Sequence, residues 1–334
     1  MELKDKKVFL IGGAGFIGSH VLDKLLELDN KVTVFDDFST GKEENIEHNN
    51  DWDKLYVVKG DIRDLDHLTD SMKGHQVVIN MATVCLRVSI NDPFYVESVN
   101  SLGALNVCQA SLNNKIERLI YVSSSEAVGT AKYFPIDEEH PCYPTTVYGA
   151  TKLSGEALTR AYFLTYKLPT IIIRPFNTYG PREHMIGKSA EIIPRMIIRI
   201  KCNQRPLIYG DGTQTRDFTY VSETAAGIIL ASESDVLLGD VVNIAYGEKV
   251  SINIIANLLL KLMNKEELGI DYPLPEGRPG DVQDHIANIQ KAKTKLGFSP
   301  RINIEEGLKK YLNWLDSRNL DYLRMLKDTE KNNW

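Results

Sequence analysis

The sequence contains few of the residues that build metal or disulfide sites. Its four cysteines (Cys85, Cys108, Cys142 and Cys202) have neither metal-ligand nor redox-motif spacing. The histidines form no HExxH pattern. We therefore expect no metal site, and we expect free thiols in a reducing cytoplasm.

Long apolar runs and clusters of positive charge are also lacking. Runs such as TIIIRPF and IIPRMIIRI are interrupted by Arg and Pro and are far shorter than a membrane span. The first residues, MELKDKKVFLIG, pass from lysines into a strand without a secretory apolar region. The formal net charge is −6 and there is no basic stripe. These features predict a cytoplasmic protein without membrane or nucleic-acid partners.

What the sequence does contain is a regular alternation of strands and amphipathic stretches. The six expected strands are KKVFLIG, KVTVFD, LYVVKGD, QVVINMA, RLIYVSS and PTIIIRP. The stretches between them include expected helices at 15–29, 93–112 and 145–167. Strands that are apolar almost throughout predict a parallel sheet covered on both faces. The predicted fold class is α/β, with a Rossmann-type doubly wound parallel sheet over residues 1–175.

The alternation breaks after Pro175. Residues 176–334 carry turn-rich segments such as YGPREH, RPLIYGDGTQT and YPLPEGRPGDV, together with one helix expected over 188–202. Residues 220–250 (approximately) regain α/β character and are expected to return to the first domain. The rest predicts a smaller, discontinuous, loop-rich substrate domain, because such loops usually hold ligands over a rigid scaffold.

A glycine-rich loop follows the first strand. The segment IGGAGFIGSH fits G-x-G-x-x-G, and its helix N-terminus could bind a pyrophosphate. A structural glycine turn would explain the loop alone, but Asp36 ends the second strand. A carboxylate there accepts hydrogen bonds from ribose hydroxyls and repels a 2′-phosphate, which favours NAD over NADP. The expected cofactor-binding residues here are Gly12, Gly15, Phe16, Ile17, Gly18 and Asp36.

The segment GDIRD follows the third strand. Asp61 and Ile62 would lie at the adenine edge of such a cofactor. Asp61 could equally belong to the N-cap of the next helix, and both interpretations stay open.

Two further segments carry ionisable groups. In TTVYGATK, Tyr148 and Lys152 are four residues apart, so they share one helix face. A phenol has a pKa near ~10, which a lysine and the positive nicotinamide ring would lower.

In YVSSSEAVGT, a strand ends in three serines and Glu126. Hydroxyls at a strand end usually mean a turn, so the carboxylate is the unexpected group.

Together, the segments GGAGFIG, SSSE, YGATK, RPFNTYGPR, YGDGTQTRDFTYV and GRPGDV resemble the extended short-chain dehydrogenases/reductases, in particular the NAD-dependent sugar-nucleotide epimerase/dehydratase family. The resemblance covers essentially the whole chain. It implies a catalytic set of Ser124, Tyr148 and Lys152, joined by Ser125 and Glu126. It further implies cofactor contacts by Ala82, Asn100, Ser123, Tyr148, Lys152 and Pro175, and substrate contacts by Arg87, Asn177, Tyr209, Arg216, Arg278 and Asp281.

The family divides after a shared first step, in which the tyrosine takes the C4 hydroxyl proton and a 4-keto sugar forms. An epimerase then returns hydride to C4. A 4,6-dehydratase must also remove the C5 proton and expel the C6 hydroxyl, which requires a nearby acid. The Ser125–Glu126 pair resembles the GDP-mannose type and the uronic-acid decarboxylases, whereas galactose-type epimerases usually lack the glutamate. Because Ser125 is a poor acid, Glu126 would perform both proton transfers.

The sequence therefore predicts an NAD-dependent nucleotide-sugar dehydratase that performs a 4,6- or 5,6-elimination. GRPGDV resembles enzymes that act on UDP-sugars, so UDP-N-acetylglucosamine or a related UDP-hexose is the expected substrate. A decarboxylase would need a cation for the sugar carboxylate, for which Arg87 and Arg182 are candidates. The alternatives are a UDP-sugar C4 epimerase and, more distantly, a non-catalytic NAD-binding sensor. The helices at 93–112 and 145–167 resemble those that pair in family homodimers.

Overall fold

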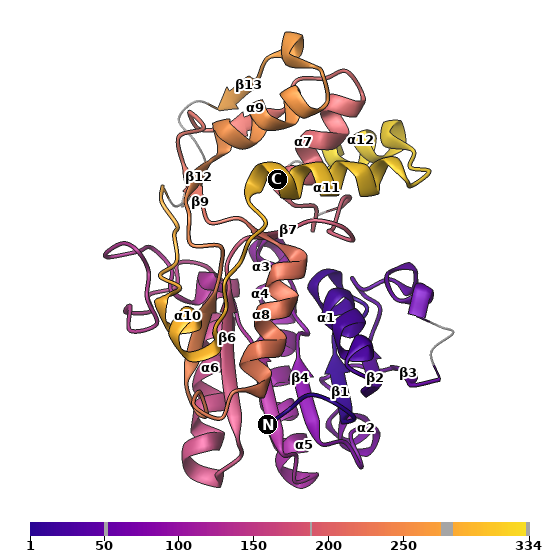
Figure 1. The fold of residues 1–334 in the computed structure, drawn as a ribbon, viewed down its shortest axis with the longest axis vertical. Helices are drawn as coiled ribbons and strands as arrows, with labels where there is room; N and C mark the ends of the chain where they lie inside the picture. The colour runs from indigo at the N-terminus through magenta and orange to yellow at the C-terminus, as the bar shows by residue number, and fades with distance from the viewer. Residues whose placement is uncertain (50–52, 188, 275–282, 332–334) are drawn as a thin grey trace.

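A seven-stranded parallel sheet forms the lower part of the molecule, and a smaller region lies above it in the computed structural model (Figure 1). The structure describes residues 1–49, 53–187, 189–274 and 283–331. The strand order is β11-β6-β5-β4-β1-β2-β3, and every pairing is parallel. The strands are β1 (Lys7–Ile11), β2 (Lys31–Asp36), β3 (Leu55–Lys59), β4 (Val77–Asn80), β5 (Arg118–Val122), β6 (Thr170–Pro175) and β11 (Val241–Ile244). The Rossmann-type α/β prediction is confirmed.

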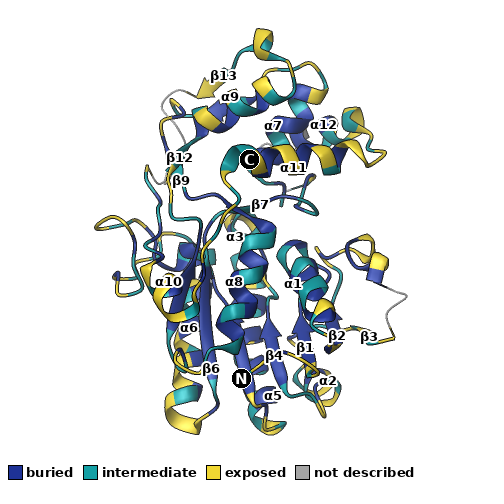
Figure 2. Ribbon diagram, viewed as in Figure 1, coloured by how far each residue is buried: buried dark blue, intermediate teal, exposed yellow. Residues whose placement is uncertain are grey.

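Helices cover both faces of this sheet, and alternate residues of each strand point to opposite faces. Val8 and Leu10 of β1 belong to the core beneath one set of helices, whereas Phe9 and Ile11 belong to the core beneath the other. The first set is α1 (Phe16–Glu27), α8 (Val221–Glu233) and α10 (Gln290–Leu296), and the second is α2 (Leu65–Ser71), α5 (Gly103–Asn113) and α6 (Val147–Tyr166). Burial on both faces explains the nearly continuous apolar strands, which Figure 2 shows in dark blue.

Three local expectations differ from the structure. Strand β3 is largely exposed, because it forms the edge of the sheet. The helix expected over 93–112 consists of α4 (Pro93–Glu97), a π-helical segment (Ser98–Leu102) and α5. The helix expected from 188 is α7 (Ile192–Lys201), because the backbone of Glu191 is still extended. A short helix, α3 (Leu86–Asn91), also follows β4.

The upper region has a hydrophobic core of its own, made by four helices. They are α7, α9 (Ile252–Leu262), α11 (Ile304–Asp316) and α12 (Tyr322–Lys331). Three two-stranded sheets accompany them: β7 (Thr178–Tyr179) with β10 (Thr219–Tyr220), β8 (Leu207–Tyr209) with β13 (Asp271–Leu274), and β9 (Thr215–Arg216) with β12 (Val250–Ser251). We propose that the separate cores mark two domains, with α8 and β11 returning to the first one.

Short helical turns complete the described chain. The 3-10 turns are η1 (Glu43–Asn45), η2 (Glu47–Asn49), η4 (Ser125–Ala127) and η5 (Glu266–Leu268). Among the described residues, no helix combines the length and apolarity that crossing a bilayer requires.

Candidate active site

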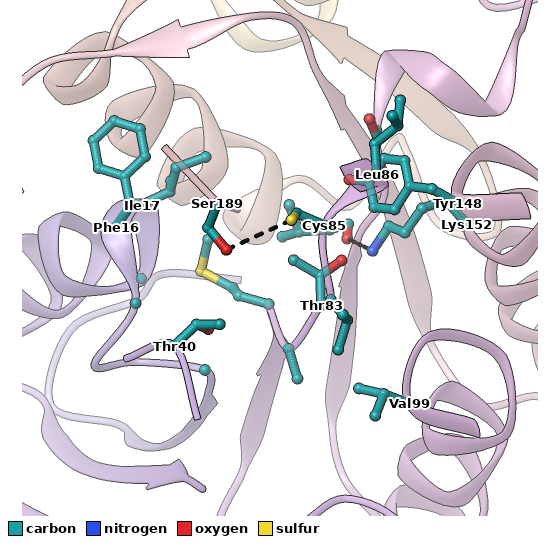
Figure 3. A pocket seen from close by; sticks show the side chains of 18 of the residues that line it. Phe16, Ile17, Thr40, Thr83, Cys85, Leu86, Val99, Tyr148, Lys152 and Ser189 are labelled. Carbon is teal, nitrogen blue, oxygen red and sulfur yellow. Dashed lines mark hydrogen bonds between the residues drawn. The ribbon is translucent and has the colours of Figure 1, made fainter. Parts of the chain in front are cut away.

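A cleft of about 810 Å³ opens at the carboxyl ends of the central strands, the usual ligand-binding edge of such a sheet. Its volume lies within the range of small-molecule sites. Figure 3 shows Tyr148 and Lys152 on one side of the cleft and Phe16 and Ile17 on the other. Both the predicted cofactor loop and the predicted catalytic residues therefore border one cavity.

The glycine loop forms one end of the cleft. Gly12, Gly15, Phe16, Ile17 and Gly18 all line it, and α1 begins at Phe16. A Cβ on Gly18 would lie 2.1 Å from the carbonyl oxygen of Gly12, so only glycine allows the helix to start this close to β1. The first-turn N–H groups of α1 are thereby available to an anion.

Asp36 lies beside this loop at the end of β2. Its carboxylate accepts hydrogen bonds from the backbone N–H groups of Ala14 (2.9 Å) and Phe38 (3.0 Å). Burial raises the pKa of Asp36, and these hydrogen bonds act in the opposite direction. Each carboxylate oxygen has a second lone pair, so the side chain can also accept from a ligand hydroxyl in the cleft that it lines.

Asp61 and Ile62 line the cleft at the end of β3. The N-cap of α2 is Asp64, whose side chain accepts from the His67 N–H, so Asp61 is not the cap. Asp61 instead binds the Arg63 guanidinium, with Arg63 Nε at 3.0 Å from Oδ1. Hydrogen bonds from Arg63 lower the pKa of Asp61.

The carboxyl ends of β4, β5 and β6 supply the middle of the cleft, where Ala82, Ser123 and Pro175 lie. Asn100 does not line it. The Asn100 side chain accepts from the Val84 N–H (2.8 Å) and donates to the Val84 carbonyl (3.0 Å). Asn100 therefore lies behind the cleft lining, where it holds the segment that follows β4 in place.

Tyr148 and Lys152 occupy the first turns of α6. The Lys152 ammonium donates to the Val122 carbonyl oxygen at 2.8 Å. Burial lowers the pKa of Lys152 to about 7, against an opposing effect of Glu156. Burial also raises the pKa of Tyr148 to about 12, although hydrogen bonding to Ser124 lowers it. The net shift of the phenol pKa is therefore upward, opposite to the expected lowering, because burial outweighs the groups that favour the phenolate.

The three serines and Glu126 form both a turn and a cleft wall. Ser124 accepts a hydrogen bond from the Glu126 N–H (3.2 Å), which caps η4. Ser124, Ser125 and Glu126 all line the cleft. The charge of Glu126 contributes to the raised pKa of Tyr148, so its carboxylate acts on the phenol. A Cβ on Gly149 would lie 2.4 Å from the Glu126 carbonyl oxygen, so a glycine in YGATK lets α6 approach this turn.

The predicted substrate residues divide into three groups. Arg87, Asn177 and Arg216 line the cleft, and the buried Asn177 Oδ1 has no hydrogen-bond partner among the described residues. Arg87 donates to the Ala190 carbonyl and Arg216 to the Thr215 carbonyl (2.9 Å). Tyr209, at the end of β8, does not line the cleft. Arg278 and Asp281 lie outside the described residues.

Arg182, a candidate cation for a sugar carboxylate, is not a cleft residue. Its Nη2 lies 2.6 Å from Asp23 Oδ2 and 2.7 Å from His20 Nδ1, both on α1. Its Nη1 also donates to the Asn45 carbonyl at 3.0 Å. Arg182 therefore ties the loop after β7 to α1.

Several cleft residues were missed by the sequence reasoning. Hydrogen bonding to Thr83 lowers the pKa of Tyr148, and Cys85 Sγ lies 3.6 Å from Ser189 Oγ (Figure 3). Thr83 and Cys85 follow β4, so the shared edge of a parallel sheet could have indicated them. Ser189 and Glu191 also line the cleft, from the loop before α7, and no sequence signal pointed to them. The described residues contain no group of three or more His, Cys, Asp or Glu that could hold a metal ion.

The chain is similar to known proteins over most of its length. Residues 9–311 match the family model described as GDP-mannose 4,6 dehydratase. The chain is 35% identical to a "Putative UDP-glucose 4-epimerase" of Methanocaldococcus jannaschii, over 93% of this chain and 99% of the relative. The structure of the UDP-N-acetylglucosamine 4-epimerase from Methanobrevibacter ruminantium, in complex with UDP-N-acetylmuramic acid, has a TM-score of 0.88 and 34% identity, covering 94% of this chain and 99% of that one.

A dTDP-glucose 4,6-dehydratase of Streptomyces venezuelae, solved with NAD and TYD bound, has a TM-score of 0.87 and 25% identity, over 93% of this chain and 97% of that one. The family match spans most of the sequence, and these relatives align nearly end to end. The chain therefore belongs to the GDP-mannose 4,6 dehydratase family, among the extended short-chain dehydrogenases/reductases that act on nucleotide sugars.

Proposed function

We propose that the protein is an NAD-dependent nucleotide-sugar dehydratase, which eliminates water from a hexose through a 4-keto intermediate. The observation that carries this proposal is Glu126, which lines the cleft and acts electrostatically on Tyr148. An inversion at C4 alone needs no carboxylate at this position, whereas removal of a C5 proton does.

The residues at the glycine-loop end fit NAD. The N-terminus of α1 can bind a pyrophosphate, and the Asp36 carboxylate can bind ribose hydroxyls while disfavouring a 2′-phosphate. Asp61 and Ile62 would face the adenine. When bound, NAD supplies the acceptor for the C4 hydride and the donor that gives it back to the sugar after water is lost, so the overall elimination needs no other oxidant.

The chain's own groups would then move the protons. Tyr148 takes the proton of the C4 hydroxyl, and its hydrogen bonding to Ser124 supports the phenolate. Lys152 lies one helical turn away on the same face and contributes positive charge. Glu126 removes the C5 proton and returns a proton to the departing C6 hydroxyl. Ser125, which is buried beside it, can hold that hydroxyl through a hydrogen bond.

The substrate we propose is UDP-N-acetylglucosamine or a related UDP-hexose. Arg216 and Asn177 line the cleft beyond the catalytic residues, where they would bind the diphosphate. The buried Asn177 Oδ1 has no partner among the described residues, which supports a hydrogen-bond donor on the ligand, whereas a diphosphate would bind the amide nitrogen. Two of the relatives described above carry UDP-sugar names, which supports uracil as the base.

Mass spectrometry of reactions with a panel of UDP-, dTDP- and GDP-sugars tests the proposal. A dehydratase gives a product that has lost one water, and a 4,6-elimination in heavy water also incorporates deuterium at C5. A product with unchanged mass and unchanged carbon-bound hydrogens would refute the elimination.

A C4 epimerase is the second candidate, because two of the three relatives described above are named as UDP-sugar 4-epimerases. The same experiment identifies it, since the product keeps its mass and changes only its configuration. A non-catalytic NAD sensor is disfavoured by the presence of Ser124, Tyr148 and Lys152 together in one cleft.

The four cysteines are all free, which is consistent with the cytoplasmic location that we propose.

We also propose a homodimer that pairs through α4, the π-helical segment, α5 and α6, which correspond to the helices expected at 93–112 and 145–167. Phe94 is 87% exposed, Leu164 60% and Leu102 45%. Large exposed apolar side chains on neighbouring helices favour burial by a second copy. Light scattering of the Phe94→Glu variant should give half the mass of the wild type; a wild-type protein that is already monomeric at micromolar concentration would contradict the dimer.

A further inference from the structure

A third ionisable residue, Glu156, extends the catalytic face of α6. Tyr148, Lys152 and Glu156 are spaced four residues apart, so their side chains lie along one side of the helix. Lys152 is 1% exposed and Glu156 4% exposed. Glu156 does not line the cleft, and the chemistry proposed above does not use it.

The Glu156 carboxylate is fixed from two neighbouring strands. Arg174, on β6, donates from Nε to Oε1 (2.8 Å) and from Nη2 to Oε2 (2.6 Å). Ser123, at the end of β5, donates from Oγ to Oε1 (2.6 Å). Arg174 is 3% exposed, so the ion pair is buried and bidentate. Such pairs have a rigid geometry, and they hold what they bind in place.

The Glu156–Ser123 hydrogen bond lies next to the backbone positions that contact Lys152 and Tyr148. Ser123 lies between Val122, whose carbonyl accepts the hydrogen bond from Lys152, and Ser124, which hydrogen-bonds Tyr148. Holding the Ser123 side chain therefore fixes the orientation of the strand end on both sides of it. The Glu156 charge also acts directly on Lys152, where it opposes the effect of burial on the pKa of that amine.

We propose that Glu156, held by Arg174, is a positioning residue of the active site, which fixes the end of β5. Its charge lies one helical turn from Lys152 on the same face of α6, and it also favours the protonated form of that amine. Protonated Lys152 in turn contributes positive charge beside the phenol. The inference rests on the proposed function only where turnover is measured.

The alternative is a purely structural ion pair that joins α6 to β6. A structural pair would change stability but would leave the titration of Lys152 unaltered. Among the described residues, the titratable and charged groups around Lys152 and its phenol partner are Tyr148 and Glu156 on α6, Tyr121 on β5, Arg174 on β6, Cys85 before α3, Cys108 on α5 and Glu126 on η4. Among these, Glu156 is the charge that acts on Lys152 in the structure.

The first test is the pH profile of turnover for Glu156→Gln and for the double variant Glu156→Gln/Arg174→Met. The double variant removes both charges together, so it avoids an unpaired buried guanidinium that could prevent folding. Without the carboxylate, Lys152 loses its proton more readily and the phenol ionises at higher pH. The acidic limb of kcat should move upward by roughly one pH unit, which is about a tenfold loss of rate below the limb.

A matched control is Asp235→Asn, which breaks another ion pair of a buried arginine, Arg118, remote from the cleft. This variant should keep the wild-type profile. An unchanged profile in the Glu156→Gln/Arg174→Met variant would overturn the proposal.

The second test needs no turnover. Lys152 has a pKa of about 7 in the folded protein, below its ordinary value of 10.5, so the unfolded chain binds its proton more readily. Stability should therefore rise with pH between those values, and Lys152→Met should remove that rise. In the Glu156→Gln/Arg174→Met background, the Lys152-dependent rise should begin at a lower pH, as measured by urea unfolding across pH.

The two tests separate the failure of this inference from the failure of the proposed function. If no nucleotide sugar is turned over, the proposed function fails and the unfolding series still decides the role of Glu156. If the rise begins at the same pH in both backgrounds, Glu156 does not act on Lys152 and the inference is wrong.

Discussion

The two ends of the cleft are built differently. The glycine-loop end comes from one contiguous strand–loop–helix segment and the ends of β2 and β3, and backbone groups of the first turn of α1 form its surface. The other end comes from side chains of distant segments, such as Arg87 on α3, Asn177 after β6 and Arg216 on β9. We expect the backbone-built end to bind the cofactor, and we expect the separate side chains to determine which sugar is bound and which reaction follows.

The largest effect is expected where the two ends meet, at Tyr148. Tyr148→Phe removes the proton acceptor and leaves the ring, so turnover should fall by about 10⁴-fold, at the upper end for a general base. NAD affinity, measured by fluorescence titration, should stay within twofold to threefold of the wild type, because the glycine loop is unchanged. Retained turnover would exclude Tyr148 from the mechanism. The removal of the C4 hydroxyl proton, which epimerases and dehydratases share, would then need another group.

Glu126→Gln tests the end of the cleft that is built from side chains of distant segments. Dehydration should slow by about 10²–10³-fold because an amide cannot take the C5 proton. Transfer of the C4 hydride, followed by the absorbance of the reduced nicotinamide, should continue. Ser125→Ala is the matched control at the neighbouring position, and we expect less than about a tenfold loss, since a hydroxyl is a poor acid. Equal losses in the two variants would argue against a special role of the carboxylate.

Gly18→Ala tests the glycine-loop end of the cleft. The added methyl would lie 2.1 Å from the Gly12 carbonyl oxygen, so α1 must move away from β1. Overpacking of this kind costs about 1–3 kcal/mol, and it should weaken NAD binding by about tenfold or more. Gly74→Ala provides the control in an exposed turn with open space, where only the φ of +77° opposes a side chain. That variant should lose about 1 kcal/mol of stability and keep its NAD affinity.

The last prediction concerns stability alone and Asp217, which holds segments of the upper region and the sheet together. Its carboxylate accepts from the N–H groups of Tyr246 (3.1 Å), Gly247 (3.1 Å) and Ala287 (3.2 Å). Burial raises the pKa of Asp217 from 3.8 to about 7. Between those values the folded protein binds the proton more readily, so stability should fall as pH rises, by at most about 1.4 kcal/mol per pH unit.

Asp217→Asn should remove this decline, which can be followed by urea unfolding at a series of pH values. The Asp211→Asn variant, at a fully exposed carboxylate nearby in sequence, should retain it. A wild-type stability that is flat between pH 4 and pH 7, approximately, would show that burial does not perturb Asp217 in this way.

Much of the fold was accessible from the sequence, and the exceptions have physical causes. The apolar strands indicated a doubly covered sheet because both faces of β1 meet helices. The π-helical segment at 98–102 was not foreseen, since its hydrophobic period differs little from that of an α-helix over five residues. The start of α7 was placed too early, because nothing in a periodic pattern shows that the backbone of Glu191 stays extended.

The candidate site divides in the same way. Gly12, Gly15 and Gly18 could be recognised because their spacing is fixed by a turn that is local in the chain. Arg182 was a candidate for the cleft, but tertiary contacts with Asp23 and His20 direct it to α1. Asn100 was expected at the cofactor, but its hydrogen bonds to Val84 place it one layer behind.

By itself, the sequence determined the sheet with its covering helices, the glycine loop, and the spacing that puts Tyr148 and Lys152 on one helix face. These features depend on local periodicity and steric limits, which a short segment carries within it. Only the tertiary structure decided that Glu156 and Arg174 support the catalytic strand end, that Lys152 is buried against the Val122 carbonyl, and that Thr83 joins Tyr148. Those outcomes depend on burial and on contacts between segments far apart in the chain, so no local pattern could contain them.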